Sequence, residues 1–383
     1  MKQGWEIKKL GEVCEVIGGS TPKTSDDTFW DGDYYWISPA ELDGSKYVYS
    51  TTRTITDAGV RSAHLQILPI GTVLLSSRAP IGKVAITKVP MYCNQGFKNL
   101  VCGKDLINEY VYWFLKHNTD YLNSLGTGAT FKEISKKVVE QIPIPVPPIA
   151  EQEKIVAELD CLSGIIEKKK QQLKELDNLA QSIFYEMFGE NAEGRNKWKI
   201  AKLGNVCKTT SGGTPSKGHP EYYEGGDIPW LRSGEVNKMN IHETELFITE
   251  DGLNNSSAKW FPKGTVVIAM YGATVGQVGI LCNPMTTNQA ICGIFPNETF
   301  TPIYLYHFLL SKKPEYLEIA TGGAQANISQ NIVRDTVVSC PPLTLQQDFA
   351  SKIEAIEKQK ELIAQSIKET ETLFNSRMDS YFN

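Results

Sequence analysis

The chain has 383 residues, of which 41% are hydrophobic and 22% are charged, and its formal net charge is −5. This composition is typical of a folded globular protein and excludes disorder as the main state. No stretch approaches the roughly 18 consecutive apolar residues of a membrane span, and the first residues do not resemble a signal peptide, so we expect a cytoplasmic protein. The eight cysteines form no Cys-x-x-Cys pair, which favours buried, reduced thiols over a metal site.

The negative charge is concentrated in two short segments. Residues 149–194 carry 10 acidic and 5 basic residues, and residues 343–383 carry 7 and 5, whereas the two longer segments are each close to neutral. A nearly neutral domain can still present a local basic face to DNA, but phosphate contacts alone would not hold it tightly.

An internal repeat with an offset of 193 to 195 residues runs through the chain. Ten of the 18 positions from Trp5 to Pro22 are identical in the segment from Trp198 to Pro215. Later matches pair Pro69–Val73 with Pro262–Val266, Asn94-Gln95 with Asn288-Gln289, Tyr110–Tyr112 with Tyr304–Tyr306, and Pro147-Pro148 with Pro341-Pro342. Two copies of a unit of about 190 residues predict a two-domain protein with approximate two-fold internal symmetry.

Each copy begins with a segment that we predict to be an α+β domain. Short apolar runs between turn residues, such as 71–76 and 264–268, predict strands. Helical periodicity appears at 108–115 and again at 302–310. We place these domains at residues 1–146 and 191–340.

Each predicted domain is followed by a long helix, at residues 147–190 and 341–383. Apolar residues recur at alternating steps of four and three from Ile155 to Met187, interrupted at Lys169, and from Phe349 to Phe374. This spacing predicts a coiled-coil seam. At about 1.5 Å per residue each helix would span about 60 Å. We expect the two helices to pair antiparallel, with one globular domain at each end.

Motifs for nucleotide binding and for common catalytic mechanisms are missing from the sequence. There is no phosphate-binding Gly-x-x-x-x-Gly-Lys-Ser/Thr loop and no Gly-x-Ser-x-Gly or His-Glu-x-x-His signature. We therefore expect a non-catalytic chain that binds no cofactor or metal itself. Two alternatives stay open: an enzyme, such as a hydrolase, that uses carboxylates such as Glu41 and Glu235, and a coiled-coil scaffold that binds only proteins.

A set of motifs occurs twice, in the same order, over essentially the whole chain. It comprises Trp-x-Ile-x-Lys-Leu-Gly-x-Val, a Gly-Gly segment with Thr-Pro, the runs Leu74–Gly82 and Ala269–Gly276, the Asn-Gln pairs, and Ile142–Pro148 before a Gln-rich helix. This ordered set resembles the specificity subunits of type I restriction-modification systems.

The resemblance implies two target-recognition domains that each read one half of a bipartite DNA site, while the paired helices fix the spacer length. It also implies that two methyltransferase subunits, which use S-adenosylmethionine to methylate adenine, dock on the helical region. Two restriction subunits, which use ATP and Mg²⁺, are implied as further partners. The chain itself would contribute double-stranded DNA binding and no catalytic residue.

Differences between the copies predict the residues that read bases, because two domains that read different half-sites should differ where they contact DNA. Ser76-Ser77-Arg78 is replaced by Ala269-Met270-Tyr271, Thr130-Phe131-Lys132 aligns with Gln325-Ala326-Asn327, and Ser38 aligns with Arg232. Arginine suits guanine, and asparagine or glutamine suits adenine. Arg78 could instead be an ordinary surface arginine or contact a phosphate. The Asn-Gln pairs that both copies share could instead be buried amides that hold a loop.

The lysines among the candidates are predicted to contact phosphates, which positions DNA without reading its sequence. The candidate DNA-binding residues are Ser38, Ser77, Arg78, Lys83, Asn94, Gln95, Lys98, Thr130, Lys132, Arg232, Lys238, Tyr271, Asn288, Gln289, Gln325 and Asn327.

Overall fold

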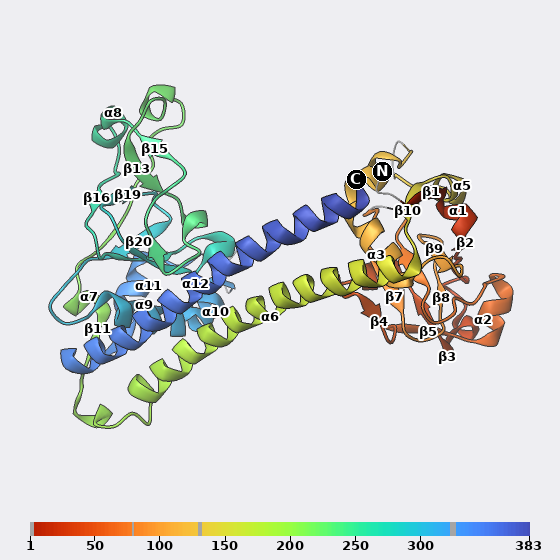
Figure 1. Ribbon diagram of the computed structural model, residues 1–383. Coiled ribbons are helices and arrows are strands. Elements are labelled where there is room, and N and C mark those ends of the chain that lie inside the picture. Colours follow the sequence, from red (N-terminus) through yellow and green to blue (C-terminus); the bar gives the residue numbers. More distant parts are fainter. Residues whose placement is uncertain (1–3, 79, 129–131, 322–326) are drawn as a thin grey trace. The chain divides into compact units, whose positions relative to one another are not determined.

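The computed structural model describes residues 4–78, 80–128, 132–321 and 327–383. It divides into two compact units: unit 1 comprises Met1–Lys170 with Gln365–Asn383, and unit 2 comprises Gln171–Ala364. Two long helices, α6 (Ile149–Phe188) and α12 (Leu343–Phe382), are each continuous and contribute one part to each unit (Figure 1). From the sequence we predict four segments, with each long helix as a separate segment. That division stays a prediction.

Unit 1 contains a five-stranded sheet in the order β2-β9-β6-β7-β4, a three-stranded sheet β5-β3-β8 and the pair β1-β10. The strands are β1 (Glu6–Lys9), β2 (Cys14–Gly18), β3 (Trp30–Ile37), β4 (Tyr47–Val48), β5 (Arg53–Ile55), β6 (Val73–Leu75), β7 (Val84–Thr87), β8 (Tyr92–Cys93), β9 (Lys98–Cys102) and β10 (Pro143–Val146). The shorter helices are α1 (Leu10–Val13), α2 (Asp57–Ser62), α3 (Asn108–His117), α4 (Thr119–Ser124) and α5 (Lys136–Glu140).

Unit 2 repeats this topology with a five-stranded sheet β12-β20-β17-β18-β14, a four-stranded sheet β15-β13-β19-β16 and the pair β11-β21. The strands are β11 (Lys199–Lys202), β12 (Thr209–Ser211), β13 (Ile228–Leu231), β14 (Asn240–Ile241), β15 (Phe247–Ile248), β16 (Trp260–Phe261), β17 (Val266–Ala269), β18 (Val278–Leu281), β19 (Met285–Thr287), β20 (Ile291–Ile294) and β21 (Val337–Cys340). The shorter helices are α7 (Leu203–Val206), α8 (Glu250–Asn254), α9 (Pro302–Ser311), α10 (Lys313–Thr321) and α11 (Gln330–Asp335). The predicted α+β class and the predicted duplication are both confirmed.

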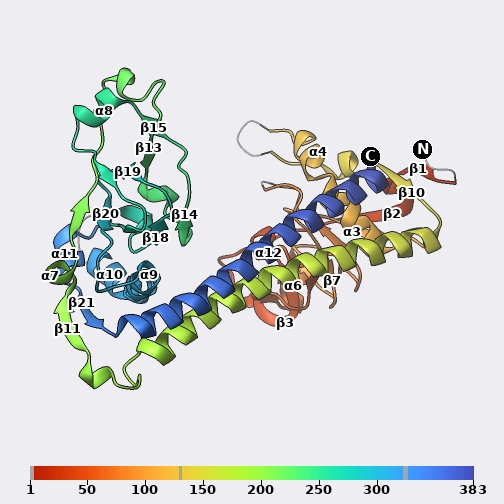
Figure 2. The same ribbon diagram turned by 60° about the vertical axis from the view of Figure 1, so that its left-hand side comes forward.

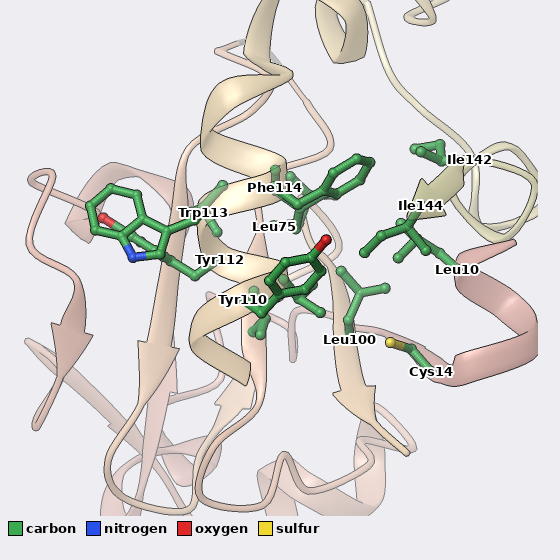
Figure 3. Packing of buried hydrophobic residues seen from close by; sticks show 14 of the residues in the cluster. Leu10, Cys14, Leu75, Leu100, Tyr110, Tyr112, Trp113, Phe114, Ile142 and Ile144 are labelled. Carbon is green, nitrogen blue, oxygen red and sulfur yellow. The ribbon is translucent and has the colours of Figure 1, made fainter. Parts of the chain in front are cut away.

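One strongly apolar helix covers the five-stranded sheet in each unit. In α3, all six residues from Tyr110 to Leu115 are buried, and Figure 3 shows Tyr110 and Phe114 directed toward Leu100 and Leu75 of the sheet. In unit 2, α9 packs on β17 and β18 in the same way (Figure 2). Each large buried side chain stabilises the fold by about 1.5–3 kcal/mol, so this layer forms the main core of each unit.

The two long helices lie antiparallel within each unit. In unit 1, Met378 and Phe382 near the end of α12 join Ile155 and Leu159 near the start of α6 in one core. In unit 2, the end of α6 packs against the start of α12 in the same manner, through Phe184, Phe188, Phe349 and Ile353. The apolar series that predicted a seam is thus confirmed as the inward face of both helices.

Polar residues of the seam contact polar residues of the facing helix. Lys169, which interrupts the first apolar series, donates to Ser366 Oγ at 2.6 Å and to Thr370 Oγ1 at 3.2 Å. Lys360, which interrupts the second, lies 2.7 Å from Asp177 and 2.8 Å from Glu357. Glu357 lies on the same helix as Lys360, so the contacts that depend on register are those of Lys169 with Ser366 and Thr370 and that of Lys360 with Asp177. They favour one register of the two helices, because a shift would separate these pairs.

Two buried glutamines lock the start of each long helix onto its own domain. Gln152 has no exposed surface; its Oε1 accepts from the Ile107 amide at 2.9 Å, and its Nε2 donates to the carbonyls of Asp105 and Pro147, both at 2.8 Å. Gln346 makes the same three bonds in unit 2, to Thr301, Thr299 and Pro341. The repeat therefore extends to individual hydrogen bonds, at an offset of 194 residues.

None of the helices in the described part of the chain combines the length and the apolar character needed to cross a bilayer.

We predict that Gln152→Leu lowers the free energy of unfolding by at least about 2 kcal/mol, because three buried backbone groups lose their partner. Urea unfolding measures the loss, and hydrogen exchange at the Ile107 amide should accelerate. Gln172→Leu, on an exposed position of the same helix, is the control and should change stability by no more than about 0.5 kcal/mol. Equal effects of the two substitutions would contradict the locking role.

Candidate nucleic-acid interface

A hollow of about 400 Å³ in unit 2 gathers three of the candidate residues, Arg232, Asn288 and Gln289. The reason lies in the sheet: β13 and β19 run parallel, with Leu231 opposite Thr287. Since the carboxyl ends of parallel strands meet at one edge, the residues that follow each strand come together there. The remaining lining residues are Thr214, Lys217, Tyr223, Trp230 and Leu246.

The same edge exists in unit 1, where β3 and β8 run parallel with Ile37 opposite Cys93. Ser38 follows the first of these strands, and Asn94 and Gln95 follow the second. Thr21 Oγ1 donates to Gln95 Oε1 in unit 1. Thr214 Oγ1 donates to Gln289 Oε1 in unit 2. The repeat thus preserves the frame of the hollow.

A tryptophan forms part of this frame in both units. The indole of Trp36 donates to the carbonyl of Ser20 at 3.2 Å, and that of Trp230 to the carbonyl of Gly213 at 2.9 Å. These contacts connect the strand edge that carries Ser38 or Arg232 to the Gly-Gly segment near the start of the same domain. The variable position is the residue after the strand, Ser38 in one unit and Arg232 in the other.

Arg232 is held by carboxylates of its own loop. Its Nε lies 3.2 Å from Glu235 Oε1 and its Nη2 lies 2.6 Å from Glu245 Oε2. Glu235 also accepts from Thr244 Oγ1 at 2.8 Å and from the Glu245 amide at 2.7 Å. Burial raises the pKa of Glu235, but these hydrogen bonds outweigh it and hold the pKa below its usual value. The Arg232 side chain remains 42% exposed, so it is oriented and still accessible.

Glu41 has the same structural role in unit 1. It accepts from the Ser38 amide at 3.0 Å and from the Thr52 amide at 2.7 Å. Glu41 and Glu235, which the enzyme alternative required as acid or base, are therefore occupied in holding Ser38 and Arg232. A general acid needs a raised pKa, whereas that of Glu235 is lowered, so Glu235 is not suited to act as a general acid.

A second group of candidates surrounds Glu133 in unit 1. Arg78 Nε lies 2.9 Å from Glu133 Oε2, and Lys98 Nζ lies 3.3 Å from both Glu133 Oε1 and Ser77 Oγ. Burial raises the pKa of Glu133, but the hydrogen bonds and charges of Arg78 and Lys98 outweigh burial and hold the pKa below its usual value. Arg78 is 45% exposed, whereas Ser77 has no exposed surface, so a base contact by Ser77 would require this loop to open.

The structure corrects the alignment of the two copies at this place. Arg78 forms a backbone bridge with Glu133, and Tyr271 forms the equivalent bridge with Asn327. Asn327 therefore corresponds to Glu133 and not to Lys132 as we predicted. Its Oδ1 accepts from the Gly272 amide at 3.3 Å. The predicted alignment used an offset of 195 residues at this place, whereas the identical Ile134-Ser135 and Ile328-Ser329 that follow the bridge agree with the offset of 194.

The other predicted residues are scattered. Lys83 donates to the carbonyls of Pro39 and Leu42 at 3.3 and 2.8 Å, so its ammonium group is engaged within the chain. Asn94 Oδ1 accepts from the Gly96 amide at 2.8 Å, which agrees with the loop-holding alternative. Lys132 is exposed, and Lys238 lines a different cavity from that of Arg232. Thr130 and Gln325 lie outside the described residues.

Sequence reasoning missed the aromatic and basic neighbours of the hollow, Tyr223 and Lys217. Tyr223 packs against Trp230 with ring centroids 5.8 Å apart, and its hydroxyl donates to the carbonyl of Pro215. Lys217 lies two residues after the Thr-Pro motif, and this position was the feature of the sequence that could have identified it. Within the described ranges, no three His, Cys, Asp or Glu side chains gather in a way that suits a metal ion. Whether the candidates contact DNA stays a prediction.

We predict that Glu235→Gln lowers the free energy of unfolding by about 1–2 kcal/mol at pH 7, since a half-buried charged acceptor of several hydrogen bonds is lost. Because the folded-state pKa of Glu235 is lowered, the advantage of wild type is fully present above the unfolded pKa near 4.5 and disappears as the pH falls through the lower folded value. Urea midpoints at pH 7 and pH 3 test this. Glu243→Gln, at an exposed neighbouring position, should show no such pH-dependent difference.

Comparison with known proteins agrees with the duplication. The family described as "Type I restriction modification DNA specificity domain" matches twice, at residues 2–178 and 195–372. The type I restriction enzyme MjaIX specificity subunit of Methanocaldococcus jannaschii is 30% identical over 377 residues, which cover 92% of this chain and 86% of the relative. The MjaVIII specificity subunit of the same organism is 26% identical over 400 residues, which cover 96% and 91%.

The fold is also similar to that of a chain in a solved structure concerned with complex assembly and conformational transition of the type I R-M system. The TM-score is 0.66 at 19% identity, with 100% of this chain and 98% of that chain covered. With the family match on both copies of the repeat, the chain belongs to the specificity subunits of type I restriction-modification systems, the non-catalytic components whose two recognition domains each bind one half of a DNA site.

Proposed function

We propose that each unit reads its half-site through the strand edge that carries Ser38 in unit 1 and Arg232 in unit 2. The observation that supports this is a repeated frame with one chemically different residue. The threonine–glutamine bond, the tryptophan and the asparagine are common to both edges, while a short hydroxyl is exchanged for a guanidinium group. Arginine donates two parallel bonds to guanine, which serine cannot do, so the two units would prefer different bases.

A second reading position is proposed at Arg78 in unit 1 and Tyr271 in unit 2. Both residues form the equivalent backbone bridge and are exposed, at 45% of the side chain for Arg78 and 40% for Tyr271. Arg78 can contact guanine or a phosphate, whereas Tyr271 can offer a hydroxyl and an aromatic face. The exposed Lys132 suits a phosphate contact that positions the duplex.

We propose further that two methyltransferase subunits dock on α6 and α12 and methylate adenine with S-adenosylmethionine that they bind themselves. Two restriction subunits would add ATP- and Mg²⁺-dependent cleavage. The absence of a phosphate-binding loop motif from the sequence supports assigning these cofactors to the partners. Because the complex would act on the DNA of the cell, we propose that it is located in the cytoplasm.

The paired helices α6 and α12 are proposed to set the length of the gap between the half-sites. A stiff, paired helix fixes a distance, whereas a flexible linker of the same length would allow the gap to vary. The polar seam contacts of Lys169 and Lys360 support this role because they fix the register of the pair.

We predict that Arg232→Ala weakens recognition of one half-site by roughly 10- to 100-fold, because a bidentate contact discriminates by about 1–3 kcal/mol. Adenine methylation is sequenced in cells that express the variant with its methyltransferase partner. The half-site read by unit 1 should be unchanged. Arg334→Ala, an exposed arginine of α11 that does not line the hollow, is the control. Loss of both half-sites in a stably folded variant would contradict independent reading.

We predict that seven residues inserted after Lys170 in α6 and seven after Ala364 in α12 lengthen the gap while both half-sites stay the same. Seven residues extend a helix by about 10.5 Å, which corresponds to roughly three base pairs at about 34 Å per ten. They also add almost two full turns, so the apolar faces stay aligned. Sequencing of methylated sites reads out the gap. An unchanged gap would show that the helices do not set it.

A further inference from the structure

Unit 2 contains a cavity of about 830 Å³, distinct from the hollow beside Arg232. It is lined by the second half of α6, the middle of α12, α9 and the segment around β14. Its walls combine apolar side chains, among them Ala180, Phe184 and Met239, with polar and charged ones such as Lys238 and Glu361. Cavities of this size and character bind ligands or side chains of partners in many proteins.

The equivalent place in unit 1 is filled by the protein's own side chains. Trp113 is 2% exposed, and its indole Nε1 donates to Asp160 Oδ1 at 2.9 Å. The ring of Phe374 lies edge-on with its centroid 5.5 Å from that of Trp113. Lys46 Nζ lies 5.2 Å from the centroid of the indole ring. The indole is thus enclosed by an aromatic ring, a carboxylate and a cation.

The offset of 194 residues that relates the two buried glutamines also relates Trp113 to His307 and Phe374 to Ala180. At both positions unit 1 has a large aromatic side chain and unit 2 has a smaller side chain, histidine or alanine. His307 and Ala180 both line the cavity. The cavity of unit 2 therefore occupies the place where unit 1 keeps its Trp113 indole.

His307 carries a hydrogen-bonding atom that its surroundings do not satisfy. The residue is 8% exposed, and its buried Nε2 has no hydrogen-bond partner among the described residues. Burial lowers the pKa of His307 to about 4, and the nearby Lys360 lowers it further against the weaker opposite effect of Asp177. The imidazole is therefore neutral at physiological pH. Nε2 itself is buried, so an occupant bonds to it only after the ring turns toward the cavity, and that bond would satisfy a buried polar atom.

The charge of the cavity favours an uncharged occupant. Lys360 lines it, but its ammonium group lies 2.7 Å from Asp177 and 2.8 Å from Glu357, so it is already paired. Burial is also the main cause that raises the pKa of the lining Tyr306 to about 12, which keeps its hydroxyl neutral. An anion such as phosphate would face the carboxylates of Asp177, Glu357 and Glu361 against only two lysines, Lys238 and Lys360. An uncharged planar group with one polar atom can instead pack against the apolar part of the walls.

We propose that the cavity of unit 2 receives a tryptophan or tyrosine side chain of a docked methyltransferase subunit, whose N–H or O–H group bonds to His307. Aromatic residues in enclosed pockets are the commonest anchors of protein interfaces. The inference rests on the proposed function and adds a difference between the docking places. Unit 1 supplies Trp113 from its own chain, whereas unit 2 takes the equivalent group from its partner.

The test fills the cavity with the residues that unit 1 uses. In the full chain with Ala180→Phe and His307→Trp, we expect one of the two methyltransferase subunits to bind at least tenfold more weakly, as measured by titration calorimetry and sedimentation. The other subunit should bind as in wild type. His219→Trp, at an exposed histidine of unit 2 outside the cavity, is the matched control and should bind both subunits normally. Ala180→Leu alone, which narrows the cavity less, should give a smaller loss.

Thermal unfolding of each variant establishes that it is folded before binding is compared. A folded filled variant that binds both subunits as tightly as wild type would overturn the inference while leaving the proposed function intact. Wild type that binds no methyltransferase subunit would refute the proposed function itself. Native mass spectrometry could instead detect a bound small molecule that the filled variant loses. If the filled variant also binds both subunits normally, the occupant is that molecule and the inference is wrong.

Discussion

The packing of each long helix against the other is the constraint on which both cores depend. In unit 1 the core contains Met378 and Phe382, almost the last residues of the chain, beside Ile155 and Leu159. In unit 2 it contains Phe184 and Phe188 from the first repeat beside Phe349 from the second. Since buried apolar area is the main driving force of folding, neither core is complete with residues of one repeat alone. Recognition by each unit therefore depends on residues contributed by both repeats.

The duplication also separates what the fold requires from what it leaves free. Gln152 and Gln346 bond to backbone groups, and a different side chain would leave those groups buried without partners. Glu41 and Glu235 likewise hold the backbone of the strand edge that carries Ser38 or Arg232. The residue that each carboxylate orients, Ser38 or Arg232, makes no comparable demand on the backbone. Two domains can thus keep one scaffold and present different chemistry at the same point.

Much of the architecture could be predicted from the sequence, because repeats and apolar periodicity are local signals. The α+β class, the duplication and the seam from Ile155 to Met187 all follow from such patterns. The glutamine locks could not be predicted, since Gln152 lies in a polar first turn and becomes buried only when the loop before α3 folds over it. The engagement of Lys83 by two carbonyls depends on a contact across 41 to 44 residues, which no local pattern reports.

The candidate site shows the same limit. The parallel pairing of β13 with β19 brings Arg232 and Asn288 to one edge, but strands of three or four residues carry too little periodicity to reveal which of them pair. The counterpart of Asn327 was also misassigned by one residue, as Lys132 instead of Glu133. Comparison of variable positions found Arg232 and Arg78 because it asks only where the copies differ. It could not tell an accessible side chain, such as Arg78, from a buried one, such as Ser77.

The difference between Trp113 and His307 shows how one scaffold can trade stability for binding. An unsatisfied buried nitrogen costs about 1–3 kcal/mol, and the smaller side chains at His307 and Ala180 forgo the packing that Trp113 and Phe374 provide in unit 1. A cost of that kind persists in proteins mainly where it serves a function. Unit 2 packs Phe184 and Phe349 on the His307 ring, and it would recover the cost of the unsatisfied nitrogen when a partner side chain enters the cavity.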